Sequence, residues 1–136
     1  MASVIRMRVF AGAVFALGFA SGLLAQKLTD SPQRVEVKRV DLSGAPGMEV
    51  ITSTAEYPPG ATVARHSHHG IEVAYVVQGA SIQLPGKEAS ALLTGASLVN
   101  LRDAEHAGFT VVGEVPLKLF TVHVVDKAQP LYEFGN

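Results

Sequence analysis

From residue 31 onward the sequence is a succession of short β-branched runs, each closed by turn residues. The first run alternates Val35 and Val37 with charged residues, and the segment 43–47 breaks it with two glycines and a proline. The chain reads as about nine strands with turn signals roughly every 8–12 residues, which is typical of a β-sandwich or β-barrel. The expected strands are 34–42, 48–57, 61–68, 71–78, 80–84, 88–93, 97–101, 105–112 and 117–125.

A chain of 136 residues suits one domain. No period of about 20–50 residues is visible, so a solenoid or a propeller is not expected. A single small domain of strands must bury these strands on one another, and an antiparallel barrel does so with few exposed edges. The formal net charge of −1 gives no electrostatic reason to expect a nucleic-acid partner.

The N-terminus has the pattern of a secretory signal peptide. Arg6 and Arg8 precede residues 9–25, a stretch of 17 residues without a charge that ends in small residues. We expect residues 1–25 to form a helix that is cleaved after Ala25, or after Gly22, and the protein to be periplasmic or secreted by a Sec-type route. The alternative is an uncleaved membrane anchor, although 17 helical residues span only about 25 Å of a roughly 30 Å hydrocarbon core.

The expected organisation is therefore a leader followed by one exported domain that has no membrane contact after cleavage. The segments are 1–25 for the leader, 26–45 for an N-terminal extension with an edge strand, 46–126 for the barrel and 127–136 for a tail. We expect the tail to be loosely attached or to form a final edge strand. The 111 residues after the leader carry 9 Lys and Arg against 12 Asp and Glu, a net charge of −3.

The chain contains no cysteine, so a metal ion can be held only by His, Asp or Glu. His66 and His68 are two residues apart on an expected strand and therefore point the same way. Glu72 begins the next strand just past the turn at Gly70, and a tight hairpin can bring its carboxylate back beside the two imidazoles. Two imidazoles and a carboxylate suit a divalent transition ion. His106 is the remote fourth candidate.

Taken alone, the His66 and His68 pair is more often a hydrogen-bonded pair on a solvated strand face than a metal site. His69 falls on the opposite face and is expected at the surface or at a rim. His123 lies in a strand-like stretch, where a buried or surface histidine is expected more often than a ligand. Strand alternation then places Gln78 on the face of Glu72 and Thr110 on the face of His106. Together with His123, these two residues are the expected polar points of the cavity lining.

The spacing of the first histidines resembles the first sequence motif of the cupin family. The segment reads Gly60-x5-His66-x-His68-x3-Glu72-x6-Gly79, and every specified position of that motif is present. The second cupin motif is matched at Gly95 and His106 only. Leu101, Asp103 and Thr110 stand where the family has Pro, Gly and Asn. We expect His106 to be delivered by a turn built around Asp103, since Asp tolerates left-handed backbone better than most residues.

The resemblance implies a double-stranded β-helix, or jelly-roll barrel, over roughly residues 46–126. It also implies one divalent transition metal, Mn, Fe, Ni, Cu or Zn, bound by His66, His68, Glu72 and His106. Cupins include dioxygenases, isomerases, decarboxylases and lyases. We therefore expect an exported metal-binding protein of the dioxygenase type that acts on a small oxygenated organic ligand. The alternative is a non-catalytic module that binds a small molecule or a metal. Cupins of this size often pair through edge strands, so the resemblance also implies a homodimer.

Overall fold

The structure is a computed structural model that describes residues 29–135, and all regular elements in this range are β-strands. The expected signal helix over residues 1–25 lies outside the described residues. Within residues 29–135 there is no helix that is long and apolar enough to cross a membrane. The expectation of an all-β fold is confirmed.

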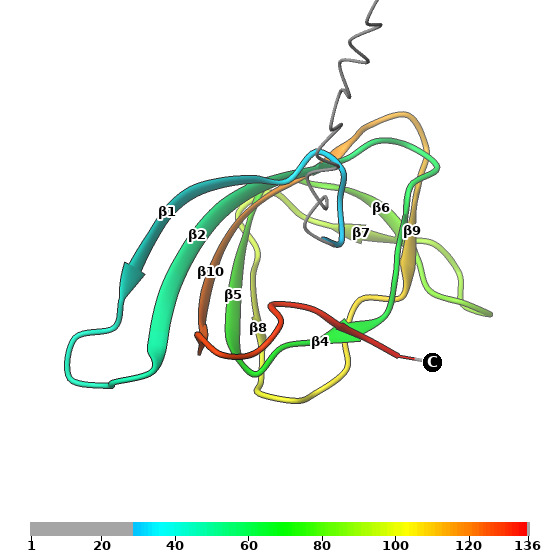
Figure 1. Ribbon diagram of the computed structural model, residues 1–136. Helices are drawn as coiled ribbons and strands as arrows, with labels where there is room; N and C mark the ends of the chain where they lie inside the picture. The colour runs from blue at the N-terminus through cyan, green and yellow to red at the C-terminus, as the bar shows by residue number, and fades with distance from the viewer. Residues whose placement is uncertain (1–28, 136) are drawn as a thin grey trace, which may run out of the picture.

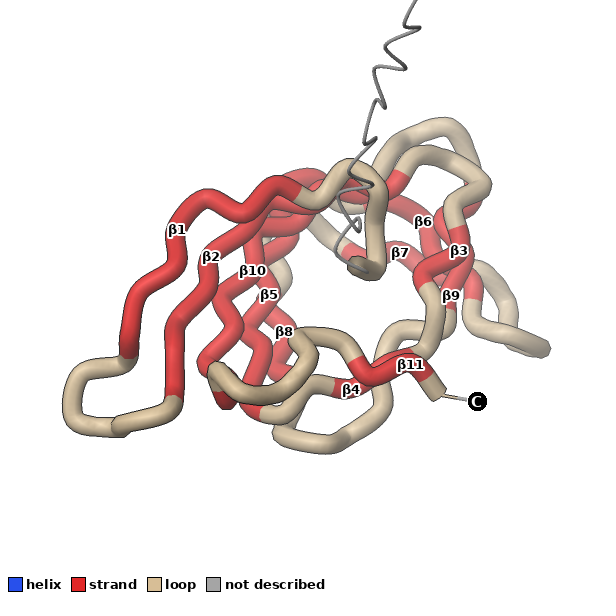
Figure 2. The backbone as a smooth tube through the Cα atoms, in the orientation of Figure 1, coloured by secondary structure: helices blue, strands red, loops and turns tan. Residues whose placement is uncertain are grey.

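The strands form two main sheets on opposite sides of a barrel (Figures 1 and 2). The larger sheet has five strands in the order β1 (Val35–Asp41), β2 (Met48–Tyr57), β10 (Leu117–Asp126), β5 (Gly70–Gln78) and β8 (Ser97–Asn100). The facing sheet has four strands in the order β3 (Thr62–Val63), β9 (Phe109–Val112), β6 (Ala80–Gln83) and β7 (Ser90–Leu92). A third, two-stranded sheet of β4 (His66–Ser67) and β11 (Glu133–Phe134) bridges one side of the barrel. All pairings are antiparallel.

Strand β10 shows how the sequence divides the barrel interior into an apolar and a polar half. Its side chains alternate strictly between buried and half-buried, as expected for a strand with one face inward. The buried positions begin with Leu117 and Leu119 and continue with Thr121 and His123. The leucines join an apolar core with Val76, whereas the polar pair lies among the buried polar residues of the other half. The first half stabilises the fold, and the second half is available for chemistry.

Several expected strands are shorter in the structure, and two of them differ by more than their ends. The segment 61–68 divides into β3 and β4, and the expected strand 105–112 begins only at Phe109. Ala107 has φ 63° and Gly108 has φ 74°, which are left-handed conformations that a strand cannot contain. These two residues turn the chain after His106, so the strand alternation expected across this segment is interrupted.

Gly79 is the glycine that closes the first motif, and its place is explained by a close approach of the backbone. A Cβ atom on Gly79 would lie 2.4 Å from the carbonyl oxygen of Leu92. No side chain can be accommodated there without moving β7, because the obstacle is backbone rather than a flexible side chain.

Candidate metal centre

Four side chains from separate segments converge in the polar half of the barrel: His66, His68, Glu72 and His106. Each offers one ligand atom, and these atoms all lie within 4.8 Å of one another. Strand β4 carries His66, the turn between β4 and β5 carries His68, and β5 carries Glu72. The structure thus brings together the four residues that the sequence proposed as ligands.

His106 reaches the group through backbone contacts rather than from a strand. Its amide donates to the carbonyl of His66 at 2.9 Å, and the amide of His66 donates to the carbonyl of His106 at 3.2 Å. The amide of Asp103 donates to the carbonyl of His68 at 2.9 Å, and Asp103 has φ 57°. The expected turn around Asp103 is confirmed. It holds His106 without the Pro and Gly of the family pattern.

The three imidazoles are oriented in the same way. Their Nδ1 atoms face backbone carbonyl oxygens: His66 faces Ala64 at 2.8 Å, His68 faces Leu131 at 2.5 Å, and His106 faces Ala104 at 3.1 Å. A carbonyl only accepts, so each Nδ1 carries the proton and donates it. The Nε2 atoms therefore present lone pairs to the common centre, which is the arrangement that metal-binding histidines adopt.

Glu72 faces these lone pairs with an ionised carboxylate. Its Oε2 lies 3.2 Å from Nε2 of His106 and 3.5 Å from Nε2 of His68, and it accepts a hydrogen bond of 2.8 Å from Asn100. Imidazole lone pairs and an ionised carboxylate repel one another at these distances. A positive charge must therefore lie between them. Either protons or a metal ion can supply the positive charge.

The electrostatics of the group follow from its burial and its contacts. Burial alone opposes the ionisation of Glu72, but the contacts with His106, His123 and His68 outweigh it and hold the carboxyl pKa well below its usual range. Burial lowers the pKa of His66 to about 4, so this imidazole is neutral at neutral pH. For His106, burial is outweighed by the nearby Glu72 carboxylate, and the pKa of His106 is raised.

The residues present fit a divalent transition metal. The buried Nε2 atoms of His68 and His106 have no hydrogen-bond partner in the described part of the chain. Buried polar atoms are nearly always satisfied, so these two nitrogens indicate a missing partner that accepts lone pairs. Three neutral imidazoles and one carboxylate are a donor set that transition metals accept.

His123 lies beside the four residues but is not one of them. It is the cross-strand neighbour of Glu72 in the β10–β5 pairing, and its Nε2 lies 3.2 Å from Oε1 of Glu72. His123 is fully buried, and burial lowers its pKa. Its place supports the carboxylate on the side away from Asn100, which binds the other oxygen.

The other two expected lining residues lie elsewhere. Gln78 is six residues from Glu72, or about 20 Å along a strand, and its amide donates to the carbonyl of Pro116 at 2.7 Å. Thr110 faces Thr62, with 3.0 Å between their hydroxyl oxygens, because the left-handed residues 107 and 108 reset the alternation after His106. Val111, not Thr110, is the buried residue of β9.

Sequence reasoning missed the C-terminal contribution to this site. The tail packs on the centre: the Tyr132 ring lies 5.2 Å from the His66 ring and 5.0 Å from the His68 ring, and the Phe134 ring lies 5.8 Å from that of His66. The signal available was a pair of aromatic residues in the tail, Tyr132 and Phe134, which are two positions apart and share one face of an extended chain. That pattern identifies a strand but not the strand it will pair with.

The N-terminal segment closes the polar half from the other side, and this too was missed. Arg34 forms a buried ion pair with Asp30 and donates to Thr121 at 2.8 Å. Asp30 also accepts a hydrogen bond from Tyr57. Burial would raise the pKa of Asp30, but Arg34 outweighs it and holds that pKa below its usual range.

Comparison with known proteins finds similarity in the fold and none in the sequence families. No family model matches the sequence, and no curated protein matches it. A structure from Klebsiella pneumoniae, described as an uncharacterized conserved protein with a double-stranded β-helix domain, matches with a TM-score of 0.55 and 18% identity. That match covers 82% of this chain and 90% of the other.

Two further solved structures are similar. The polyketide cyclase RemF from Streptomyces resistomycificus matches with a TM-score of 0.50 and 15% identity, over 79% of this chain and 74% of the other. A cupin-like protein from Thermotoga maritima matches with a TM-score of 0.49 and 19% identity, over 76% and 74%. With its two facing antiparallel sheets, this chain has the double-stranded β-helix fold.

Proposed function

We propose that the protein is an exported, metal-dependent oxidoreductase of the dioxygenase type that acts on a small oxygenated organic ligand. The observation that carries the metal part is the orientation of the three imidazoles. Each Nδ1 is bound to a carbonyl, which leaves each Nε2 to the common centre. Nε2 of His106 and Nε2 of His68 lie 3.2 Å and 3.5 Å from the Glu72 carboxylate. A divalent transition metal held by these four residues would act as a Lewis acid towards an oxygen-bearing ligand.

The residues of this chain would orient the ligands of that metal and exclude water from it. Asn100 and His123 contact opposite oxygens of Glu72 and fix the carboxylate, and the Leu131 carbonyl fixes His68. Tyr132, only 6% exposed, shields the centre from bulk water. Such exclusion of water strengthens electrostatic interactions at the site.

The test is metal content followed by oxygen consumption. The metal-reconstituted protein should consume oxygen with one of three substrate classes, namely flavonols, β-diketones or catechols, and a Glu72→Gln variant should not. Oxygen uptake that is equal in this variant would contradict the proposal.

A binding module without turnover is the second candidate, and one observation favours it. The described part of the chain covers the centre with the tail residues Tyr132 and Phe134, which leaves little of His66 and His68 accessible. Ligand-induced thermal stabilisation without oxygen uptake or product would support this reading.

Export remains part of the proposal, with a periplasmic or secreted protein as the first choice and an N-terminally anchored one as the alternative. It is supported by the uncharged stretch 9–25 behind Arg6 and Arg8. Mass spectrometry of the mature N-terminus tests it: loss of residues 1–25 or 1–22 supports a cleaved leader, and Met1 on membrane-bound protein supports the anchor.

We also propose a homodimer that forms through the outer face of the five-stranded sheet. This face carries the exposed apolar side chains Val73, Tyr75 and Val99. Five strands at about 4.8 Å spacing and about seven residues at 3.3 Å give a face on the order of 20 by 23 Å. That is a large part of the roughly 800 Å² that each partner buries in a standard interface, and a second copy presents the same apolar face.

A further inference from the structure

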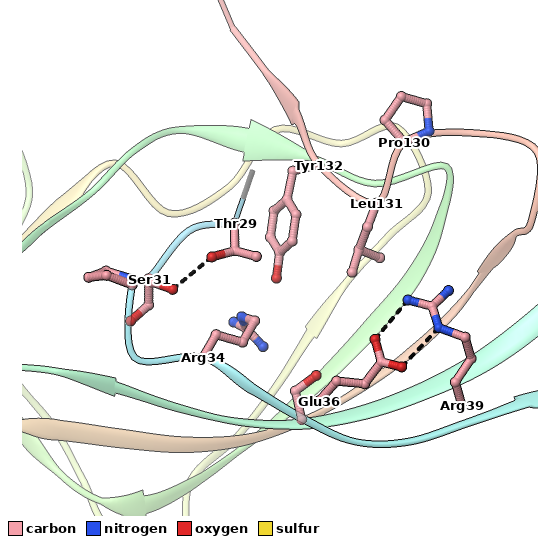
Figure 3. A pocket seen from close by; sticks show the side chains of 10 residues that line it. Thr29, Ser31, Arg34, Glu36, Arg39, Pro130, Leu131 and Tyr132 are labelled. Carbon is pink, nitrogen blue, oxygen red and sulfur yellow. Dashed lines mark hydrogen bonds and ion pairs between the residues drawn. The ribbon is translucent and has the colours of Figure 1, made fainter. Parts of the chain in front are cut away.

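A cavity of about 840 Å³ lies between the two terminal segments of the described chain (Figure 3). One wall is formed by Ser31 and Arg34 of the N-terminal turn, and the other by Pro130, Leu131 and Tyr132. Its volume is within the range of roughly 300–1,000 Å³ that is typical of small-molecule sites.

The cavity is next to the metal centre but distinct from it. Tyr132 lines the cavity and also contacts the rings of His66 and His68. None of the described residues that line the cavity is one of the four candidate ligands. One aromatic ring therefore separates the two spaces.

The charged side chains at the cavity are already paired with one another. Arg34 binds both carboxylate oxygens of Asp30. Arg39 binds both carboxylate oxygens of Glu36 and also Glu49. The remaining lining consists of hydroxyl-bearing and apolar side chains. A charged ligand would have to disrupt these pairs, so the walls favour a neutral ligand.

Tyr132 offers an unused polar group at this place. Its side chain is more than nine-tenths buried, and its hydroxyl has no hydrogen-bond partner among the described residues. Figure 3 shows the ring between Thr29 and Leu131 with its hydroxyl directed towards Arg34, whose guanidinium lies 5.7 Å from the ring centre. Burial raises the pKa of Tyr132, so the hydroxyl stays protonated and can donate.

We propose that this cavity binds a neutral, mostly apolar small molecule whose hydroxyl or carbonyl oxygen accepts a hydrogen bond from Tyr132. The inference extends the proposed function, on which its choice of an oxygenated ligand rests, by giving that ligand a site of its own. The site adjoins the metal centre, because Leu131 lines the cavity while its carbonyl accepts the hydrogen bond of His68 at 2.5 Å.

The experiment uses two fluorescent probes of the same ring size, 2-naphthol and 2-methylnaphthalene, which lacks the oxygen. The full chain is freed of metal with EDTA and titrated with each probe. We expect saturable binding of one 2-naphthol per chain, and binding of 2-naphthol at least about threefold tighter than 2-methylnaphthalene, as one net hydrogen bond allows. The anion 2-naphthoate should bind more weakly than 2-naphthol.

Tyr132→Phe removes only the hydroxyl and should abolish the preference for 2-naphthol over 2-methylnaphthalene, while both still bind. A merely structural effect would weaken both probes equally. Tyr75→Phe is the matched control, because Tyr75 is exposed on the outer sheet face, and it should leave the preference unchanged. Leu131→Trp, which fills the cavity, should weaken both probes at least tenfold.

Absence of saturable 2-naphthol binding would overturn the proposal, and so would a preference retained in Tyr132→Phe or tighter binding of 2-naphthoate. Zinc binding to the same preparations is measured separately by calorimetry. Zinc binding without probe binding would contradict only the proposed ligand site in the cavity. Probe binding without zinc binding would contradict only the proposed metal-dependent function. The two proposals can thus fail independently.

Discussion

His106 is the residue whose delivery to the centre departs most from the pattern that the sequence resembles. The turn that carries it contains Asp103 and Ala107 with positive φ, and neither residue is a glycine. Left-handed backbone at such residues costs on the order of 1–2 kcal/mol each. Both strained residues lie close to a candidate ligand, and backbone strain tends to be concentrated at functional sites.

The first prediction concerns the contribution of His106 to metal affinity. His106→Gln should weaken zinc binding by at least about 100-fold, because even the partners of metal ligands contribute roughly 10–100-fold. His69→Gln is the matched control, since His69 is a surface histidine that contacts Asp103 and Glu133. Calorimetric titration of both variants checks this, and equal affinities would refute the four-ligand site.

The second prediction follows from the raised pKa of His106. Burial lowers this pKa, but the Glu72 carboxylate 3.2 Å away outweighs burial, so part of the metal-free protein carries a proton on His106 near neutral pH. The proton is bound below the raised pKa and competes with the metal there. Apparent zinc affinity should therefore rise with pH through the neutral range.

Zinc titrations in buffers of different ionisation enthalpy measure the protons released at each pH. His106→Gln should release fewer protons than the parent at pH 6. Equal release from both proteins would show that the proton comes from another group.

Strand β11 is short, yet it completes the centre. Its two residues pair with β4, and the preceding Leu131 carbonyl accepts the Nδ1 proton of His68. The tail thus contacts His66 through strand pairing and His68 through the Leu131 carbonyl. It contributes little to the apolar core, which lies in the other half of the barrel.

Removal of the tail separates these two roles. A chain that ends at Gln129 should keep its β-sheet circular dichroism but bind zinc roughly 10–100-fold more weakly, because His68 loses its carbonyl partner. Leu131→Ala keeps that carbonyl and should bind zinc as the parent does. A truncated chain with full affinity would show that the tail only covers the site.

The molecule as a whole is a barrel with an apolar and a polar half, and this division could be predicted only in part. Periodicity gave the all-β fold, and the spacing of His66, His68 and Glu72 gave residues that the structure brings together. Gln78 and Thr110 were misplaced, since strand alternation says nothing about distance along the strand or about left-handed interruptions. The roles of Arg34 and Tyr132 depend on contacts between the two ends of the chain, for which local sequence carries no signal.

The buried ion pair of Asp30 and Arg34 makes a prediction about acid stability. The folded-state pKa of Asp30 is depressed, so its stabilisation is present above the unfolded pKa of about 3.9 and is lost as the pH falls through the folded value. Asp30→Asn leaves Arg34 buried without a counter-charge and should cost about 3–5 kcal/mol of unfolding free energy at pH 7.

Urea unfolding at pH 7 and pH 3 measures this difference, which should shrink at the lower pH. Asp41→Asn serves as the control, because Asp41 pairs with Lys127 at the exposed surface and should contribute less than about 1 kcal/mol. If Asp30→Asn lowers the free energy of unfolding equally at both pH values, the loss of stability is steric and not electrostatic.

The outer face of the five-stranded sheet carries a prediction at the same scale. Val99→Lys places a charge within the proposed interface, on its edge strand β8, and should convert a dimer into a monomer in sedimentation equilibrium. Leu93→Lys changes another exposed apolar residue, which lies outside the five strands, and should leave the dimer intact. If the parent protein is monomeric at micromolar concentration, the proposed interface is wrong.

The position of the C-terminus beside β4 has a practical consequence for purification (Figure 1). Gly135 packs against Glu105, the residue next to His106. A polyhistidine tag attached after residue 136 would therefore bring six or so additional imidazoles, as such tags carry, within reach of the centre, where they can bind the same transition metals. Metal contents measured on such a fusion would report the tag as well as the protein. The hairpin around Gly86, which joins β6 and β7 on the facing sheet, is the better place for an affinity handle.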